Sequence, residues 1–205
     1  MLALFIDLAG SKKLFALVSD ERTLAHTAVN DHTEERLMEI IEVLLKNQKK
    51  TLHDLTHILA VTGPGGFMSL RVAVSLANAL SWSLKIPSTG IHLSDLWASR
   101  VPNPNPNPFL WLHSTKKTLL FVRGFGEFSK EWPEPTLISI DELVAKSKKP
   151  IANCYLGELI EEHQKMLKTF KPLKPLLSVV DVLPALLKNC LWQKKTLSPW
   201  YGRSG

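Results

Sequence analysis

The chain has 205 residues, 45% of them hydrophobic and 21% charged, which is the composition of an ordinary soluble globular protein with room for one large domain or two small ones. Its net charge of +6 permits contact with nucleic acid or an acidic partner without requiring it. The two cysteines, Cys154 and Cys190, have no metal-ligand spacing, which favours a reduced, cytoplasmic protein. No run approaches the roughly eighteen apolar residues of a membrane span, and the first ten residues lack the features of a signal peptide.

The first hundred residues alternate predicted strands and helices. Three apolar runs joined by short turns predict three strands, and a helix that Thr33 can cap follows them with an apolar face at helical spacing. A fourth strand, a long helix, a fifth strand and a short helix come next. The predicted strands are 2–8, 14–19, 23–29, 58–62 and 87–91, and the later helices are 68–84 and 93–99.

A proline at every second position marks the segment 102–108, PNPNPNP, which excludes a helix and favours a stiff spacer. After this segment the chain begins again with strands. The order of strands and helices seen in the first hundred residues then recurs in a less regular form. We therefore expect a duplicated α/β unit with halves at 1–101 and 109–205, the second half shortened and its tail packed back on the first. The predicted elements are strands at 109–113, 118–125, 136–140 and 151–155, a short helix capped by Asp141, and helices at 157–170 and 179–190.

A glycine-rich turn, GPGGF at Gly63 to Phe67, follows the fourth strand and opens the long helix. Glycines allow close backbone approach and a helix N-terminus attracts anions, so a ligand cradle and a plain tight turn are both open. The turn lacks the Gly-Lys-Ser/Thr ending of a P-loop and the spacing of the dinucleotide fingerprint. The helix after it is apolar nearly all round, which predicts that more than one of its faces is covered.

Two further groups of residues are candidates for a metal site. His53 and His57 have the spacing of paired metal ligands on a helix, but the start of a strand at His57 favours two loop histidines. Asp7, at the end of the first strand, could hold a metal through water, but the hairpin after it is poor in phosphate-binding residues. We interpret Asp7 as a turn residue and predict no metal, cofactor or catalytic site. Several lysines are interpreted as solvated charge, the alternative being a tRNA-facing patch, which would need them to converge on one face. They are Lys12, Lys13, Lys116, Lys117, Lys146, Lys148 and Lys149.

The sequence GPGGFMSLR, Gly63 to Arg71, resembles the signature Gly-Pro-Gly-Ser-Phe-Thr-Gly-Leu-Arg of the TsaB (YeaZ) family. The residues kept are Gly63, Pro64, Gly65, Phe67, Leu70 and Arg71, and the departures are Gly66, Met68 and Ser69. Flanking segments are similar in the same order, namely Ile6-Asp7, His32-Thr33, residues 90–98, and a tail motif of Pro199, Tyr201 and Arg203. Residues 113–120 depart from the family's Asp-Ala-Arg-x-Gly-Glu-Val-Tyr strand, since the aspartate, arginine and glycine are absent.

The resemblance implies an α/β protein of the actin-like ATPase (ASKHA) fold, built from two ribonuclease-H-like halves. It implies a non-catalytic, cytoplasmic subunit that pairs with a TsaD-like paralogue. That paralogue transfers the threonylcarbamoyl group to adenosine next to the anticodon of tRNA. It further implies a TsaE-like ATPase as a third member and only indirect contact with tRNA. The chain is expected to have no cofactor of its own. ATP or ADP could bind at the interface of the complex. Without its partner, the chain could form a homodimer.

The same resemblance implies that the first two long helices of each partner form a four-helix bundle. Small residues in the helix 68–84 would let helices approach closely, whereas the other interpretation is a helix buried inside its own domain. The resemblance favours the interface, so Ala77→Arg or Leu76→Glu is expected to abolish pairing and leave a folded monomer. The expected interface residues are Leu37, Ile41, Leu44, Val72, Ala73, Leu76, Ala77 and Leu80.

An alternative function is a small actin-like kinase or hydrolase that uses Asp7 and the glycine turn on ATP. Titration with magnesium-ATP distinguishes it from the partner subunit. A peptidase that uses His53 and His57 is a third interpretation, which metal analysis tests.

Overall fold

The computed structural model describes residues 1–29, 36–103, 107–146 and 154–202. The chain divides into two compact units, of which unit 1 is Met1–Leu93 with the C-terminal residues from Ser178 on, and unit 2 is Ser94–Leu177. These bounds differ from the predicted halves 1–101 and 109–205. The physical reason is that helix α6 (Val179–Lys188) packs against the strands of the first sheet and so belongs to unit 1.

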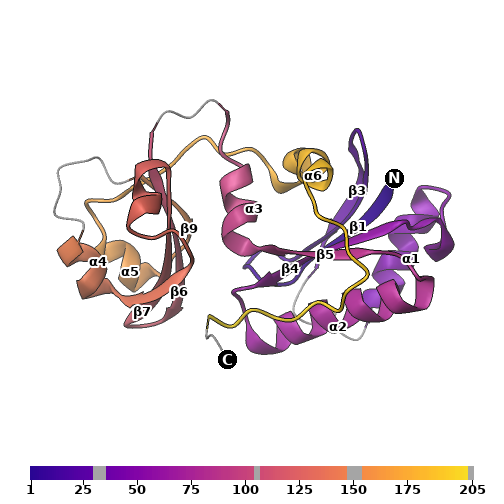
Figure 1. Ribbon diagram of the computed structural model, residues 1–205, viewed down its shortest axis with the longest axis horizontal. Helices are drawn as coiled ribbons and strands as arrows, with labels where there is room; N and C mark the ends of the chain where they lie inside the picture. Colours follow the sequence, from indigo (N-terminus) through magenta and orange to yellow (C-terminus); the bar gives the residue numbers. More distant parts are fainter. Residues whose placement is uncertain (30–35, 104–106, 147–153, 203–205) are drawn as a thin grey trace. The chain divides into compact units, whose positions relative to one another are not determined.

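Unit 1 is built on a mixed five-stranded sheet with the order β3-β2-β1-β4-β5. The first three strands form an antiparallel meander, and β4 and β5 are parallel to β1. In Figure 1, α1 and α2 lie on one face of this sheet and α6 lies on the other. The elements are β1 (Leu2–Asp7), β2 (Leu14–Ser19), β3 (Thr23–Ala28), α1 (Leu37–Asn47), η2 (Leu52–Asp54), β4 (His57–Gly63), α2 (Phe67–Leu84), β5 (Ser88–His92) and α6.

The core of unit 1 lies between the sheet and helices α1 and α2. Strand β1 is buried along its whole length, which explains why it reads as a continuous apolar run. Alternate residues of the strands point toward the two helices, as the period of two requires. The strand residues in this cluster include Leu4, Ile6, Phe15, Leu17, Ile58 and Ala60, and the helix residues include Leu37, Ile41, Leu45, Ala73 and Ala77.

Unit 2 repeats the topology of unit 1 with a sheet of order β10-β9-β6-β7-β8. Strands β6, β7 and β8 form an antiparallel meander, and β9 and β10 are parallel to β6. Its elements are α3 (Leu93–Ser99, whose first residue belongs to unit 1), β6 (Phe109–Lys116), β7 (Leu119–Phe125), η3 (Gly126–Lys130), β8 (Thr136–Ser139), α4 (Ile140–Lys146), β9 (Cys154–Glu158), α5 (Glu161–Met166) and β10 (Lys171–Pro172).

The predicted duplication is confirmed by this topology, because both sheets pair five strands in the same order and with the same directions. The order is that of a ribonuclease-H-like half, and two such halves make up the actin-like ATPase fold. The second half is shortened in its helices. Helix α2 has 18 residues, whereas α5, which occupies the equivalent place between the fourth and fifth strands, has 6.

Several local predictions in the second half were wrong. Asp141 lies inside α4, and the hydroxyl of Ser139 accepts a hydrogen bond from the Glu142 N–H at 3.1 Å, so Ser139 caps that helix. The predicted helix at 157–170 is limited to Glu161–Met166, because Gly157 and Glu158 continue strand β9. The cap Thr33, the centre of the proline-rich spacer and the first part of the strand 151–155 lie outside the described residues.

Helix α2 satisfies the length and composition of a membrane-spanning helix, with 18 residues and a mean hydropathy of 1.2. The expectation that no segment approaches such a span was therefore wrong for α2. Its residues Leu70, Ala73 and Ala77 are nevertheless fully buried within the unit. A stripe buried against a sheet is the behaviour of a core helix in a globular domain.

Candidate functional site

The glycine-rich turn is held between two other stretches of backbone. A Cβ atom on Gly63 would lie 2.3 Å from the carbonyl oxygen of Trp200, and one on Gly65 would lie 2.5 Å from the carbonyl oxygen of Ala9. Gly63 also has a φ of 142°, which other residues rarely adopt. These two glycines are therefore required by close backbone contacts within unit 1.

Gly66, where the sequence departs from the family signature, has different surroundings. It is the N-cap residue of α2, and no side chain caps that helix. A Cβ atom there would meet only the Ser69 side chain, at 3.5 Å or more. The position consequently has room for the serine of the signature, which would cap the helix.

The signature turn and the tail motif form a single site. The Trp200 N–H donates a hydrogen bond to the Thr62 carbonyl at 2.8 Å. The ring of Tyr201 lies 5.1 Å from the ring of Phe67, and the Arg71 guanidinium lies 5.0 Å from the same ring. The sequence predicted the two motifs separately, and the structure brings them together; Arg203 lies outside the described residues.

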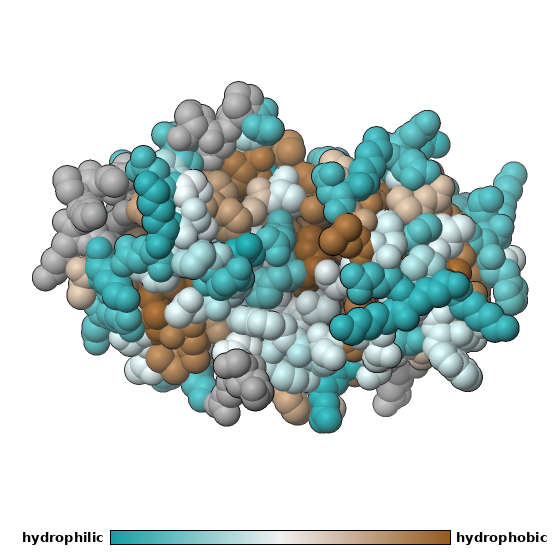
Figure 2. All heavy atoms as spheres, in the orientation of Figure 1, coloured by the Kyte–Doolittle hydropathy of each residue, from teal (hydrophilic) through white to brown (hydrophobic). Residues whose placement is uncertain are grey.

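This site presents an apolar surface at the start of α2. Phe67 is 55% exposed and Met68 is 62% exposed, although both are large apolar side chains. Figure 2 shows residues of intermediate hydropathy where the N-terminal half of α2 lies in Figure 1, with a hydrophobic residue at the lower edge. The start of α2 therefore exposes two large apolar side chains, Phe67 and Met68, to which another molecule could dock.

The predicted interface residues lie mostly on the wrong side of their helices. The residues that are at most 7% exposed, and so belong to the core, are Leu37, Ile41, Leu44, Ala73, Ala77 and Leu80. Val72 and Leu76 are half-buried and pack against the same core. The substitution Ala77→Arg would therefore place a charge in the core, and it cannot serve as a test of pairing in a folded monomer.

The outward-facing apolar residues of the two helices were missed from the sequence. We call four of them the outer face, namely Met38 and Val43 on α1 and Met68 and Ala79 on α2. The signal that could have identified the α2 residues is the pair Arg71 and Ser75, which are exposed and lie on the same side of the helix.

The two other candidate groups have structural roles. His53 lies in η2 and His57 begins β4, so they do not share a helical face, and His57 packs edge-on against Trp192 at 4.5 Å. Burial lowers the pKa of His57. Among the described residues, no group of three or more His, Cys, Asp or Glu side chains could hold a metal ion.

Asp7 is buried at the end of β1, where it belongs to the hairpin that follows. Its Oδ1 accepts a hydrogen bond from the Ala9 N–H at 2.9 Å, as in a turn closed by an aspartate. The Lys13 ammonium donates to the Ser69 hydroxyl at 3.2 Å. The bond between Asp7 and Ala9 agrees with the interpretation of Asp7 as a turn residue.

Comparison with known proteins relates the chain to enzymes and proteins of tRNA modification. The family model TsaD, described as tRNA N6-adenosine threonylcarbamoyltransferase, matches residues 25–179. A TsaB protein of Buchnera aphidicola (subspecies Schizaphis graminum), named for tRNA threonylcarbamoyladenosine biosynthesis, is 35% identical over 62% of this chain and 62% of its own length. A tRNA N6-adenosine threonylcarbamoyltransferase of Vesicomyosocius okutanii is 42% identical over 49% of this chain and 31% of its own length.

The fold of the chain is shared with a solved structure. A Pseudomonas aeruginosa protein, described as similar to peptidase YEAZ, matches 98% of this chain and 99% of its own with a TM-score of 0.72 at 16% identity. The family model covers most of the chain, and several relatives named TsaB match it as well. The chain belongs to the TsaB (YeaZ) family.

Proposed function

We propose that this chain is a non-catalytic subunit that pairs with a TsaD-like transferase and supports the formation of threonylcarbamoyladenosine in tRNA, next to the anticodon. Family membership supports this role, because relatives named TsaB are biosynthesis proteins for that modification. The relatives named as transferases indicate the kind of partner. We place the complex in the cytoplasm, since two free cysteines suit a reducing compartment.

The observation on which the proposal depends is the outer face of α1 and α2. The opposite sides of these helices are already buried against the sheet, so the apolar side chains of the outer face have no role in the fold of unit 1. The Met68 side chain, for example, is 62% exposed. Exposed apolar residues on a helical surface suit a protein interface, and small ones such as Ala79 allow a partner helix to approach closely.

The remaining members of the complex follow from this pairing. We propose that a TsaE-like ATPase joins the pair and that ATP or ADP, if it takes part, binds at the interface of the complex. The chain itself then needs no cofactor. In the absence of its partner, the outer face would support a homodimer through the same helices.

The substitution Ala79→Arg tests the pairing. Ala79 is exposed, and arginine has a high helix propensity, so the variant is expected to keep the fold and its circular dichroism spectrum. A charged side chain in the middle of the outer face should abolish co-purification with the cognate TsaD-like protein. The matched control is Val144→Arg, since Val144 is an exposed apolar residue on α4 of unit 2. Undiminished co-purification of the Ala79→Arg variant would place the interface elsewhere.

Reconstitution of the modification tests the role itself. Threonylcarbamoylation of tRNA by the TsaD-like and TsaE-like proteins is expected to require the wild-type chain and to fail with the Ala79→Arg variant. Full modification without the chain would contradict the proposal. Calorimetric titration with magnesium-ATP addresses the alternative, because micromolar binding and turnover that Asp7→Asn abolishes would instead identify a kinase or hydrolase.

A further inference from the structure

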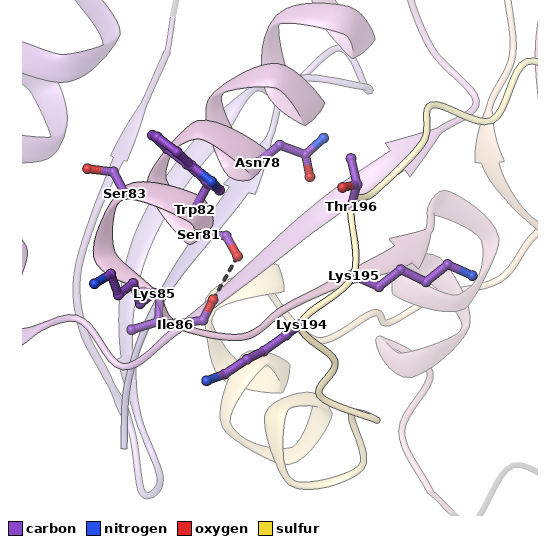
Figure 3. A pocket seen from close by; sticks show the side chains of 9 residues that line it. All are labelled: Asn78, Ser81, Trp82, Ser83, Lys85, Ile86, Lys194, Lys195 and Thr196. Carbon is purple, nitrogen blue, oxygen red and sulfur yellow. Dashed lines mark hydrogen bonds between the residues drawn. The ribbon is translucent and has the colours of Figure 1, made fainter.

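A cavity of about 590 Å³ opens in unit 1 where α2 ends and the tail passes beside it. Figure 3 shows that its lining comes from the last turns of α2, the residues that follow the helix, and a stretch of the tail. The lining residues are Asn78, Ser81, Trp82, Ser83, Lys85, Ile86, Lys194, Lys195 and Thr196. The cavity is separate from the signature turn, which lies at the other end of α2.

The floor of the cavity is fixed by hydrogen bonds within the protein. The Asn78 amide donates to the Leu197 carbonyl at 3.0 Å and accepts from the Leu197 N–H at 2.8 Å. The Ser81 hydroxyl donates to the Ile86 carbonyl at 2.7 Å. These bonds hold the tail beside the helix, so the cavity is formed before any ligand binds.

The charge of the cavity has one sign. Three of its lining side chains are lysines, and none of its nine described lining residues is acidic. Lys85 ends the helix in a left-handed conformation, with a φ of 57°. Lys194 extends from the tail toward that end of the helix, whereas Lys195 extends from the other side of the tail. Figure 2 also shows strongly hydrophilic residues along the tail beside α2. Such a cluster attracts a polyanion.

Trp82 adds an aromatic surface to this charge. Its side chain is 85% exposed, on the last turn of α2, and it lines the cavity. An indole ring that is this exposed makes little contribution to the core and is accessible to a ligand. Exposed aromatic rings beside cationic side chains are the usual means by which proteins bind single-stranded nucleic acid, because every base has a face that can stack.

We propose that this cavity binds a single-stranded segment of RNA, with a base stacked on Trp82 and the neighbouring phosphates close to Lys85 and Lys194. This inference goes beyond the proposed function, in which the chain reaches tRNA only through its partner. An acidic peptide would satisfy the lysines but would leave the indole ring without a stacking group. The combination of ring and cations therefore favours RNA.

Fluorescence anisotropy with the full chain alone and a labelled 12-nucleotide single-stranded RNA tests the proposal. Trp82→Leu, which keeps an apolar side chain without the aromatic face, is expected to weaken binding at least about fivefold, whereas Trp82→Phe should retain most of it. Lys194→Gln with Lys195→Gln should weaken binding and lower the slope of log affinity against log salt concentration by about one. The matched control is Lys49→Gln with Lys50→Gln, an exposed lysine pair of unit 1 outside the cavity, which should change neither quantity.

Three results would overturn the proposal. These are no RNA binding at 50 mM salt, equal affinity for Trp82→Leu and the wild-type chain, or tighter binding of an oligoglutamate peptide than of RNA. Because no TsaD-like protein is present, the experiment does not depend on pairing with the transferase. Failure of the RNA proposal would leave the proposed function intact, and co-purification of the Trp82→Leu variant with the partner would show that directly.

Discussion

Gly65 and Gly66 are adjacent in the signature turn but have different surroundings. A Cβ atom on Gly65 would lie within 2.9 Å of three backbone atoms of Ala9, and backbone cannot move aside as a flexible side chain can. We expect Gly65→Ala to lower the free energy of unfolding by about 2 kcal/mol or more. Gly66→Ser should instead raise it by about 0.5 kcal/mol, because the serine caps α2 and restricts the unfolded chain. Urea unfolding of both variants measures the difference, and a neutral Gly65→Ala would show that the first hairpin can move.

We expect His113 to make the stability of unit 2 depend on pH. It is 8% exposed, its Nδ1 has no hydrogen-bond partner among the described residues, and its ring stacks on Trp111 at 5.7 Å. Burial lowers the pKa of His113, with a smaller opposing effect of Glu158. In the unfolded chain the pKa of a histidine is about 6.5. The unfolded chain therefore binds this proton more tightly than the folded state does. Stability should be lost as the pH falls through that value.

The substitution His113→Phe checks this expectation, because phenylalanine can keep the stacking on Trp111 without titrating. The loss of unfolding free energy between pH 7.5 and 5.5 should be smaller in this variant than in the wild type. Some loss will remain, since burial also lowers the pKa of His57. The exposed His53, changed to glutamine, is the control and should leave the full pH dependence. An unchanged dependence in His113→Phe would assign the effect to other groups.

The residues of the signature turn could be predicted from the sequence, but their contacts could not. The resemblance identified Gly63, Gly65 and Phe67, and the structure gives the reasons for the glycines. Their neighbours, Ala9 and Trp200, are far away in the sequence, and no local pattern relates them to the turn. Backbone packing of this kind depends on tertiary structure, which periodicity and spacing do not describe.

At the level of elements, the tail is fastened to α2 by the amide of Asn78. This side chain makes two hydrogen bonds to the backbone of Leu197, one as donor and one as acceptor. We expect Asn78→Ala to cost about 1–2 kcal/mol of unfolding free energy, because both backbone groups lose a partner. Amide hydrogen exchange of the tail should rise, whereas that of strand β1 should change less. Asn78→Asp, which keeps the acceptor and loses the donor, should have an intermediate effect, and equal protection of the tail in all three proteins would refute the assignment.

The long helix α2 also shows which part of an element its sequence can specify. The apolar run predicted residues 68–84, and the structure has Phe67–Leu84. The direction of the buried side could not be predicted in the same way, since a helix that is apolar nearly all round has no distinct hydrophobic stripe. The predicted interface therefore included Ala73 and Ala77, which pack on the sheet. Helix α1 does have a distinct hydrophobic stripe, so its residues were misplaced for a different reason. The stripe was predicted to contact the partner, whereas it packs in the core of unit 1.

At the level of the whole molecule, the duplication was visible in the order of elements but in no repeated residues. Both units pair five strands in the same order, so the topology is preserved where sequence similarity is not. The sequence analysis placed too long a helix at α5, which has 6 residues, and did not predict β10, which has 2. Short elements have little periodicity to detect, and their ends are determined by packing within the unit.

The two units differ in how the chain supplies their residues. Unit 2 is one continuous segment with its own cluster of buried residues, which includes Leu110, Leu112, Val122 and Leu143. Unit 1 is made from two separate segments, because α6 and the tail return to it from the end of the chain. Within α6, Leu183 and Leu187 are buried, and the Thr23 hydroxyl donates to the Val180 carbonyl at 2.6 Å. The first 93 residues alone therefore lack part of their core.

We accordingly expect a fragment of residues 94–177 to fold alone and a fragment of residues 1–93 to remain largely unfolded or aggregate. Dispersed amide signals in a nitrogen–proton correlation spectrum and a cooperative urea transition would indicate folding of either fragment. Addition of a peptide of residues 178–202 should restore both properties to the first fragment, because the peptide supplies α6 and the partner of Ser88 in the bridge to Gln193. A scrambled peptide of the same composition is the control. Cooperative unfolding of residues 1–93 without any peptide would mean that the first sheet is stable without α6.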